Sequence, residues 1–266
     1  MDDQGKRVAL VTGGAGMIGR AVAIELASRG WSLFIHHTVC DGREDQTLAA
    51  IEEEATRAAQ AVRVACGHGD LSHADARDLL VEQALDAYGR VDMLVNAATS
   101  PPGEAQDLLE MSPEAYRHVT DTMLTGTLFL TQLVANEMVR LVEAGQLERP
   151  RIVTINSIGA YTTSMDQAPH CLARAGLSMM TKLFADRLGQ HGIGVYEVCV
   201  GIVTSGTGDP VHPRYDTLIA DGLTPIRRWG RPGDVARAVA AIAEDYLAFS
   251  TGEVINVDGG FHLRRL

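Results

Sequence analysis

The chain has 266 residues, of which 46% are hydrophobic and 21% are charged, and its formal net charge at pH 7 is −11. This composition is typical of a globular protein with enough apolar material for a sizeable core, in one large domain or two small ones. The negative charge argues against a nucleic-acid partner or an anionic membrane surface, because phosphates would be repelled. No apolar run approaches the roughly 18 residues that a membrane-spanning helix needs.

The cysteines and the start of the chain indicate a compartment. Cys40, Cys66, Cys171 and Cys199 are widely separated, which fits a reducing environment better than a disulfide framework or a zinc site. We therefore expect no metal site. The acidic start of the sequence runs directly into a predicted strand and lacks the pattern of a signal peptide. These features predict a cytoplasmic protein.

Short apolar runs, which we interpret as strands, alternate with longer helical patterns. The predicted strands are Arg7–Val11, Ser32–His37, Ala61–Cys66, Val91–Asn96, Arg151–Asn156, Gly194–Val200 and Glu253–Val257. The main predicted helices are Ile18–Arg29, Gln46–Ala59, Ala74–Tyr88, Pro113–Glu143, Gln167–Gln190 and Pro232–Asp245. Continuous apolar strands separated by amphipathic helices predict a parallel sheet covered on both faces. The expected fold class is α/β: a doubly wound, seven-stranded parallel sheet of the Rossmann type, in a single domain of residues 1–266.

A glycine-rich turn follows the first predicted strand and opens the first predicted helix. It reads Thr12-Gly13-Gly14-Ala15-Gly16-Met17-Ile18-Gly19. The glycines at 13, 16 and 19 permit a tight turn and let the backbone approach a pyrophosphate, which the helix N-terminus attracts. The turn therefore predicts a dinucleotide-binding domain, and the alternative is a packing turn without a ligand.

Further motifs follow this turn in order along the chain. They are Gly69-Asp70-Leu71, Asn96-Ala97-Ala98-Thr99, Ser157 followed by His170-x-x-x-Arg174, Gly201-Ile202-Val203-Thr204 and the stretch Ser250–Gly260. Over nearly the whole chain they resemble motifs of the short-chain dehydrogenases/reductases, in particular 3-oxoacyl-carrier-protein reductases. The resemblance implies that the residues that bind the cofactor are Thr12, Gly13, Gly16, Met17, Ile18, Gly19, His37, Thr38, Asp70, Leu71, Asn96, Ala97, Arg174, Gly201 and Val203.

The choice between NAD(H) and NADP(H) depends on the end of the second predicted strand. An acid at this position holds both hydroxyls of the adenosine ribose in NAD enzymes, and the resemblance places His37 there. Without a carboxylate at 37 a 2′-phosphate is tolerated, and His37 or Arg43 could help to bind it. We expect NADP(H) to be favoured over NAD(H), although Thr38 is not the arginine that would strengthen this preference.

The catalytic set departs from the family pattern. The family uses Asn, Ser, Tyr and Lys, and the corresponding residues here are Met123, Ser157, His170 and Arg174. His170 and Arg174 are four residues apart on a predicted helix and share a face. A nearby arginine lowers the pKa of a histidine, which favours a neutral His170 as a base.

We predict Ser157, His170 and Arg174 as the catalytic residues. The alternatives are an inert site, and substitute roles for a tyrosine and a cysteine near the motif, Tyr161 and Cys171. Adjacent helix residues point apart, so Cys171 is expected in the core rather than beside His170 as a nucleophile.

The predicted function is an atypical NADP(H)-dependent oxidoreductase acting on a carbonyl or alcohol of a small molecule. One alternative is a non-redox enzyme (dehydratase, isomerase or cyclase) with His170 as base, and another is a catalytically silent subunit that pairs with an active homologue. The resemblance implies a homo-oligomer, a dimer or tetramer. The region 203–224, rich in Gly, Pro, Ser and Thr, is predicted as a substrate lid, with a mobile surface loop as the alternative.

Overall fold

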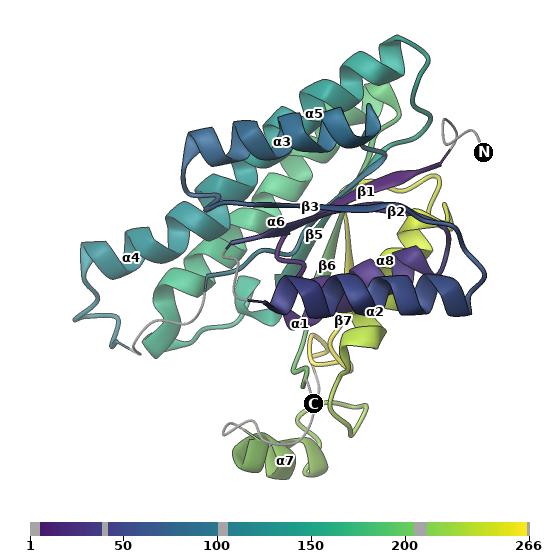
Figure 1. Ribbon diagram of the computed structural model, residues 1–266. Coiled ribbons are helices and arrows are strands. Elements are labelled where there is room, and N and C mark those ends of the chain that lie inside the picture. Colours follow the sequence, from purple (N-terminus) through teal and green to yellow (C-terminus); the bar gives the residue numbers. More distant parts are fainter. Residues whose placement is uncertain (1–5, 39–41, 101–105, 205–211, 265–266) are drawn as a thin grey trace.

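The computed structural model describes residues 6–38, 42–100, 106–204 and 212–264, apart from the side chains of residues 43, 44 and 212–214. Within these ranges seven parallel strands form one sheet in the order β3-β2-β1-β4-β5-β6-β7 (Figure 1). The strands are β1 (Val8–Val11), β2 (Ser32–His37), β3 (Val64–His68), β4 (Met93–Asn96), β5 (Arg151–Ser157), β6 (Gly194–Val200) and β7 (Glu253–Val257). The predicted single, doubly wound domain is confirmed. The strand order reverses between β1 and β4, which is where folds of this type bind ligands.

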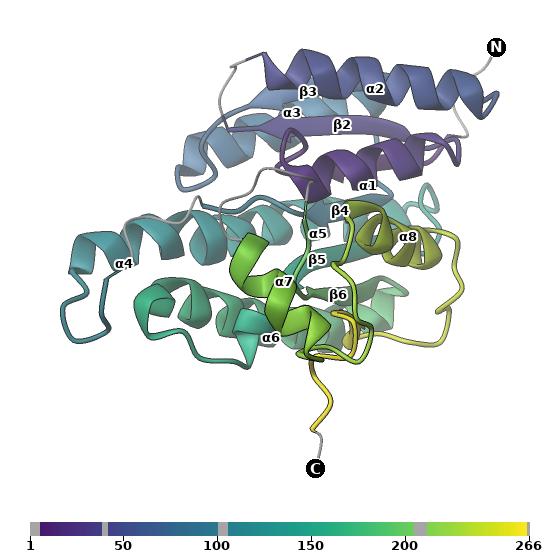
Figure 2. The ribbon, with the colours of Figure 1, turned by 90° about the horizontal axis from the view of Figure 1, so that it is seen from below.

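Helices cover both faces of the sheet (Figures 1 and 2). One face carries α1 (Met17–Ala27), α2 (Arg43–Arg57) and α8 (Pro232–Ala243), and the other carries α3 (Ala74–Tyr88), α5 (Thr127–Glu143) and α6 (Ala168–Leu188). Successive strand residues point to opposite faces, so Ala9 and Val11 join the core under α1 and α8, whereas Leu10 joins the core under α3 and α5. This two-sided burial explains why the central strands β1 and β4 are almost entirely apolar.

Several element boundaries differ from the sequence prediction, those of the third strand and of the helix predicted for 113–143 among them. The third strand begins at Val64 rather than Ala61, because its pairing with β2 starts at Leu33 and runs to the end of that strand. The single helix predicted for 113–143 is interrupted: α4 (Pro113–Thr120) is followed by a π-helical turn (Asp121–Gly126) and then by α5. The π turn places Gly126 against the backbone of Leu71, where a Cβ would lie 2.6 Å from the carbonyl oxygen. A π turn of this kind often marks a functional region.

The region predicted as a lid contains a helix, which the weak periodicity did not indicate. Helix α7 (His212–Ala220) lies below the carboxyl end of β6, apart from the two helical layers (Figure 1). On its N-terminal side Val203 forms an isolated parallel bridge with Gly230. Residues 205–211 lie outside the described residues, so the lid role stays a prediction.

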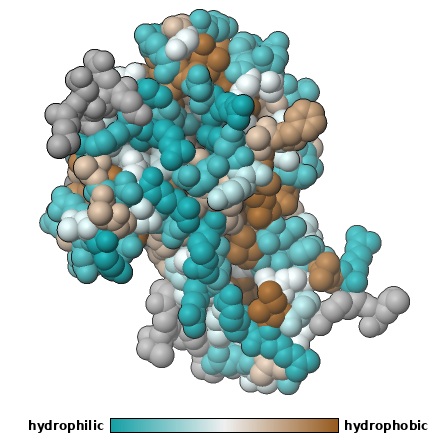
Figure 3. Space-filling view, turned by 90° about the vertical axis from the view of Figure 1, so that its right-hand side faces the viewer, coloured by the Kyte–Doolittle hydropathy of each residue, from teal (hydrophilic) through white to brown (hydrophobic). Residues whose placement is uncertain are grey.

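The face shown in Figure 3 is mostly hydrophilic and has a narrow band of apolar side chains. Among the described helices, none combines the length and apolar character that crossing a bilayer requires.

Gly19 is expected to tolerate no side chain. A Cβ at this position would lie 2.3 Å from the carbonyl oxygen of Gly13, whereas a Cβ at Gly189 would meet no atom within 4 Å. Both glycines have the backbone of a right-handed helix or its end. Gly19→Ala should lower the free energy of unfolding by about 2–3 kcal/mol through overpacking. The matched change Gly189→Ala should be neutral or stabilising. Urea denaturation of both variants measures the difference, and equal stabilities would contradict the close approach.

Candidate active site

A cavity of about 500 Å³ lies at the carboxyl ends of β1, β2 and β4. It is lined by Gly13, Ala15, Gly16, His37, Thr38, Asp70, Ala97, Ala98, Thr99, Ser100, His118 and Thr122. We call this cavity the nucleotide groove. It lies beside the reversal of strand order, and half of its lining residues were predicted from the sequence as cofactor-binding residues.

The glycine-rich turn fits a pyrophosphate. Gly13 has a left-handed backbone (φ 64°), and a Cβ there would lie 2.8 Å from the carbonyl oxygen of Ala97. Gly16 is the N-cap residue of α1, and among the described residues no side chain caps this helix. The first N–H groups of a helix have no partner within it. They therefore remain available to the oxygens of a phosphate at the groove.

A buried histidine supports this turn, and the sequence analysis did not identify it. His36 donates from Nε2 to the carbonyl oxygen of Gly69 (2.8 Å), and its Nδ1 accepts the N–H of Gly13 (3.4 Å). Burial lowers the pKa of His36 to about 4, so the ring is neutral and can fill both roles at pH 7. The alternation of the strand offered one signal, since it places His36 and His37 on opposite faces.

The groove also carries a carboxylate, Asp70, together with His118. The Asp70 carboxylate accepts the N–H of Ser72 (2.8 Å). Partial burial opposes its ionisation, but this hydrogen bond and the nearby His73 and His118 outweigh burial and lower the pKa of Asp70. His118 comes from α4 and lines the groove. It was not predicted, because only the interruption of the long helix brings α4 to this position.

Several residues predicted to bind the cofactor support the groove without lining it. Thr12 Oγ1 accepts the N–H groups of Ala97 and Ala98 (both 3.0 Å) and ties β1 to the loop after β4. The Asn96 amide donates to Thr131 on α5 (2.9 Å). Of the other predicted residues outside the lining, Met17 is exposed, and Ile18 and Val203 pack on the core. Gly19 and Leu71 are buried, and Gly201 packs against Asp258.

His170 is a partly buried imidazole near the groove. Its Nε2 is buried and has no hydrogen-bond partner among the described residues. The backbone of Ser100 hydrogen-bonds the ring and favours its protonated form, so we assign this bond to Nδ1 donating to the Ser100 carbonyl. Burial, aided by the charges of Arg174 and His118, lowers the pKa of His170. The ring is therefore neutral at pH 7, and its Nε2 lone pair can accept a proton.

Arg174 does not extend freely toward a ribose. Its guanidinium donates to the carbonyl oxygen of Ile155 (3.0 Å) and to the hydroxyl of Thr99 (3.3 Å). Burial lowers its pKa to about 10, so the group is still charged at pH 7. Arg174 thus contacts Thr99, and His170 contacts Ser100. These two residues are consecutive in the loop after β4. The predicted shared helix face is confirmed, and its target is this loop.

Met123 and Ser157, the other two members of the altered catalytic set, lie in different surroundings from each other. Met123 is buried in the π turn, and its sulfur lies 3.7 Å from Thr99 Oγ1. Ser157 ends β5, and its hydroxyl accepts the N–H of Gly159 (3.2 Å). A Cβ at Gly159 would lie 3.3 Å from Ser157 Oγ and 3.9 Å from Arg174 Cγ. The Ser157 hydroxyl therefore borders the turn of α6 that carries Arg174, although no described contact joins it to His170.

Tyr161 is poorly suited to proton transfer. Its hydroxyl donates to the Asp258 carboxylate (3.3 Å), and burial together with nearby Cys199 and Asp258 raises its pKa. A tyrosine of this kind is a poor acid or base at neutral pH. Cys171 follows His170 on α6 and is only half-buried, so its predicted place in the core is wrong.

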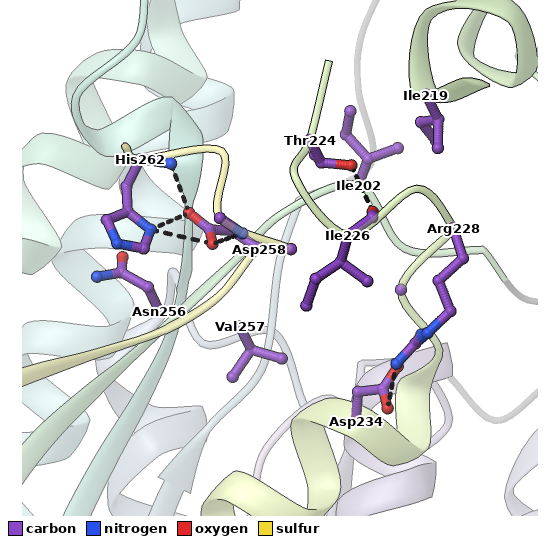
Figure 4. A pocket seen from close by; sticks show the side chains of 13 residues that line it. Ile202, Ile219, Thr224, Ile226, Arg228, Asp234, Asn256, Val257, Asp258 and His262 are labelled. Carbon is purple, nitrogen blue, oxygen red and sulfur yellow. Dashed lines mark hydrogen bonds and ion pairs between the residues drawn. The ribbon is translucent and has the colours of Figure 1, made fainter. Parts of the chain in front are cut away.

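A second, smaller cavity of about 260 Å³ lies between the segment after α7 and the chain beyond β7 (Figure 4). Its apolar wall consists of Ile202, Ile219, Ile226 and Val257. A hydrogen bond between His262 and Asp258 (2.8 Å) and an ion pair between Arg228 and Asp234 (2.7 Å) flank it. It shares no lining residue with the nucleotide groove. Within the described residues, no group of three or more His, Cys, Asp or Glu side chains could hold a metal ion.

Comparisons with known proteins agree with this geometry. Residues 13–262 match the family described as enoyl-(acyl carrier protein) reductase. The chain is 31% identical to L-rhamnose 1-dehydrogenase (NAD(P)(+)) from a Sphingomonas species, over 98% of this chain and 97% of the relative. It is 32% identical to (2S)-[(R)-hydroxy(phenyl)methyl]succinyl-CoA dehydrogenase subunit BbsD from Thauera aromatica, over 96% of both chains.

Solved structures give the same result. A 3-oxoacyl-[acyl-carrier protein] reductase from Brucella melitensis in complex with NAD is 35% identical, with a TM-score of 0.87, over 98% of this chain and 99% of that one. A variant of actinorhodin polyketide ketoreductase with NADPH is 28% identical, with a TM-score of 0.85, over 99% of this chain and 100% of that one. Both similarities cover the whole sheet and the groove.

Proposed function

Because the chain belongs to the short-chain dehydrogenase/reductase family, we propose that it is a nicotinamide-dependent oxidoreductase that interconverts an alcohol and a carbonyl of a small molecule, with His170 as the proton-transfer group. The observation that carries the proposal is the neutral imidazole of His170, whose buried Nε2 lone pair is unpaired among the described residues. The relatives named above are dehydrogenases and reductases, which supports the reaction class.

His170 suits alcohol oxidation better than carbonyl reduction. A bound NAD(P)⁺ would accept the hydride from the carbinol carbon. The Nε2 lone pair of His170 would take the hydroxyl proton, which leaves a carbonyl and an imidazolium. The Ser100 carbonyl fixes the tautomer by holding Nδ1–H, so Nε2 is the acceptor. In the reductive direction the same ring would have to be protonated, which its lowered pKa opposes.

Ser157 and Arg174 would assist at the oxygen and at the cofactor. The Ser157 hydroxyl borders the Arg174 turn and would hydrogen-bond the substrate oxygen. Arg174 would keep its positive charge next to His170 and oppose formation of an imidazolium before the substrate binds. Its bond to Thr99 (3.3 Å) would have to yield if the guanidinium is to reach the ribose.

We further propose that NADP(H) is preferred over NAD(H). His37 stands at the end of β2 in the position of the acid that binds the ribose hydroxyls, and it lines the groove with Thr38. Arg43, the other predicted partner of a 2′-phosphate, has a side chain outside the described residues. The relatives do not decide the matter, since one is named for NAD(P)(+) and the two structures hold NAD and NADPH.

A fluorescence titration of the purified protein with NADPH and NADH tests which of the two nucleotides the protein binds more tightly. Micromolar binding of NADPH and weaker binding of NADH are expected, followed by a change in nicotinamide absorbance when an alcohol substrate is supplied with NADP⁺. Tighter binding of NADH would overturn the preference. Turnover without an absorbance change would indicate the non-redox alternative, and no binding of either nucleotide would overturn the proposal.

A second candidate function is a catalytically silent subunit. It is favoured by Met123, buried where the family has asparagine, and by the engagement of Arg174 with Ile155 and Thr99. Leu172, Met179 and Leu183 are more than half exposed along one side of α6, which supports assembly with a second copy or with a homologue. One relative is itself named as a subunit. Nucleotide binding without turnover of any substrate would favour this candidate.

A further inference from the structure

A buried acid lies in β6, directly behind the turn of α6 that carries Arg174. Glu197 is 1% exposed. Its Oε1 accepts hydrogen bonds from the Asn156 amide on β5 and from the Ser178 hydroxyl on α6 (both 2.9 Å). Its Oε2 is buried and has no hydrogen-bond partner among the described residues. A buried carboxyl group that is only half satisfied is costly for folding, so its position needs an explanation.

The Asn156 amide links this acid to Arg174. Its nitrogen lies 2.9 Å from the Arg174 carbonyl oxygen, 3.1 Å from Ser178 Oγ and 2.9 Å from Glu197 Oε1. The Arg174 carbonyl thus receives a side-chain donor in addition to the backbone donor that its helix supplies. Glu197 orients Asn156, and Asn156 holds the helical turn from which Arg174 reaches Ile155 and Thr99.

We propose that Glu197, acting through Asn156, is a positioning residue for Arg174. This goes beyond the function proposed above, because none of the three network residues lines the nucleotide groove. Its consequence for nucleotide binding, however, rests on that proposed function.

Burial and the groups around Glu197 act on its carboxyl in opposite directions. Burial raises the pKa of Glu197, against the opposing effects of Ser178, Asn156, Lys182 and Arg174. The titratable groups that act on it are Lys182 and Arg174 on α6 and Cys199 on its own strand. The neighbouring strands place Thr154 and Val254 opposite it. The hydrogen bonds from Ser178 and Asn156 lower the pKa because they favour the carboxylate as their acceptor, so the network does not depend on a protonated Glu197.

Hydrogen exchange of the α6 peptide around Arg174, followed by mass spectrometry and corrected for intrinsic rates, tests the proposal. At pH 6 Glu197→Ala should exchange about 10-fold faster than wild type there, whereas Glu197→Gln, which keeps the acceptor, should match wild type. Glu253→Gln, at an exposed acid on β7, is the matched control and should exchange as wild type does. Equal protection in wild type and Glu197→Ala, or faster exchange in Glu197→Gln, would overturn the proposal.

NADPH affinity gives the second readout. Glu197→Ala should weaken binding several-fold, Glu197→Gln should restore it, and Glu197→Ala should have no further effect in an Arg174→Ala background. An additive double variant would show that Glu197 does not act through Arg174. If the wild-type protein binds no NADPH, the proposed function fails, and the exchange experiment alone decides the role of Glu197.

Discussion

Replacing His170 with phenylalanine is expected to lower the turnover of alcohol oxidation by about 100-fold or more, the usual range for loss of a proton-transfer group. The neutral ring has its Nε2 lone pair buried and unpaired among the described residues, and phenylalanine keeps the ring shape without any acceptor. The affinity for NADPH should change little, because His170 does not line the groove. Steady-state rates, together with a fluorescence titration, separate the two effects. His191→Phe, at the far end of the same helical region, is the control and should keep full activity.

The pH dependence of the same reaction gives an independent check on His170. Burial and the charges of Arg174 and His118 lower its pKa from the ordinary value of about 6.5. The neutral base is present above the lowered pKa, so oxidation should be flat near pH 7 and fall only when the pH drops well below 6.5. Arg174→Gln removes one of the lowering charges and should move this acid limb to higher pH. An acid limb above pH 7 in the wild-type enzyme, or unchanged turnover in His170→Phe, would exclude the proposed role.

The fold could be predicted because its signals are local and repeated. The strands β2 and β6 are buried along nearly their whole length and consist mostly of apolar residues, and their predicted limits match the structure. The glycine-rich turn was recognisable for a similar reason, since only glycine fits where Gly13 and Gly19 approach other backbone atoms. The π turn at Asp121–Gly126 escaped prediction because its cause, the contact of Gly126 with Leu71, is a tertiary one.

The sequence predicted which residues belong to the candidate site, but not the hydrogen-bond partners of those residues. The spacing of His170 and Arg174 placed them on one face, yet the partners of that face, Thr99 and Ser100, lie more than 60 residues away in the sequence. The supporting residues His36 and Glu197 lie inside apolar strands, where a single polar residue gives no sign of its contacts. Such contacts depend on strand order, which brings β6 beside β5 and β2 beside β1.

Introducing a carboxylate at the glycine-rich turn is expected to abolish nucleotide binding without unfolding the protein. Gly16 is exposed and has the extended backbone of an N-cap residue (φ −74°, ψ 159°), a position that aspartate and asparagine both favour. In Gly16→Asp the new carboxylate would accept the first N–H groups of α1 and repel the pyrophosphate. Two charges 4 Å apart near a protein surface interact by about 4 kcal/mol. Screening in the open groove reduces this, so we expect a loss of NADPH affinity of about 100-fold, or ~2.7 kcal/mol.

Gly16→Asn is the matched control, because it has the same shape and capping ability but no charge. A Cβ at this position lies 3.1 Å from the Gly13 carbonyl oxygen in both variants, so any steric cost is shared and cancels in the comparison. Both should melt at or above the wild-type temperature, and Asn should bind NADPH much more tightly than Asp. The difference between them should shrink as salt is raised, because screening weakens the repulsion. Equal affinities of the two variants would place the phosphates elsewhere. A difference that persists at high salt would mean that screened repulsion between the carboxylate and the pyrophosphate is not its cause.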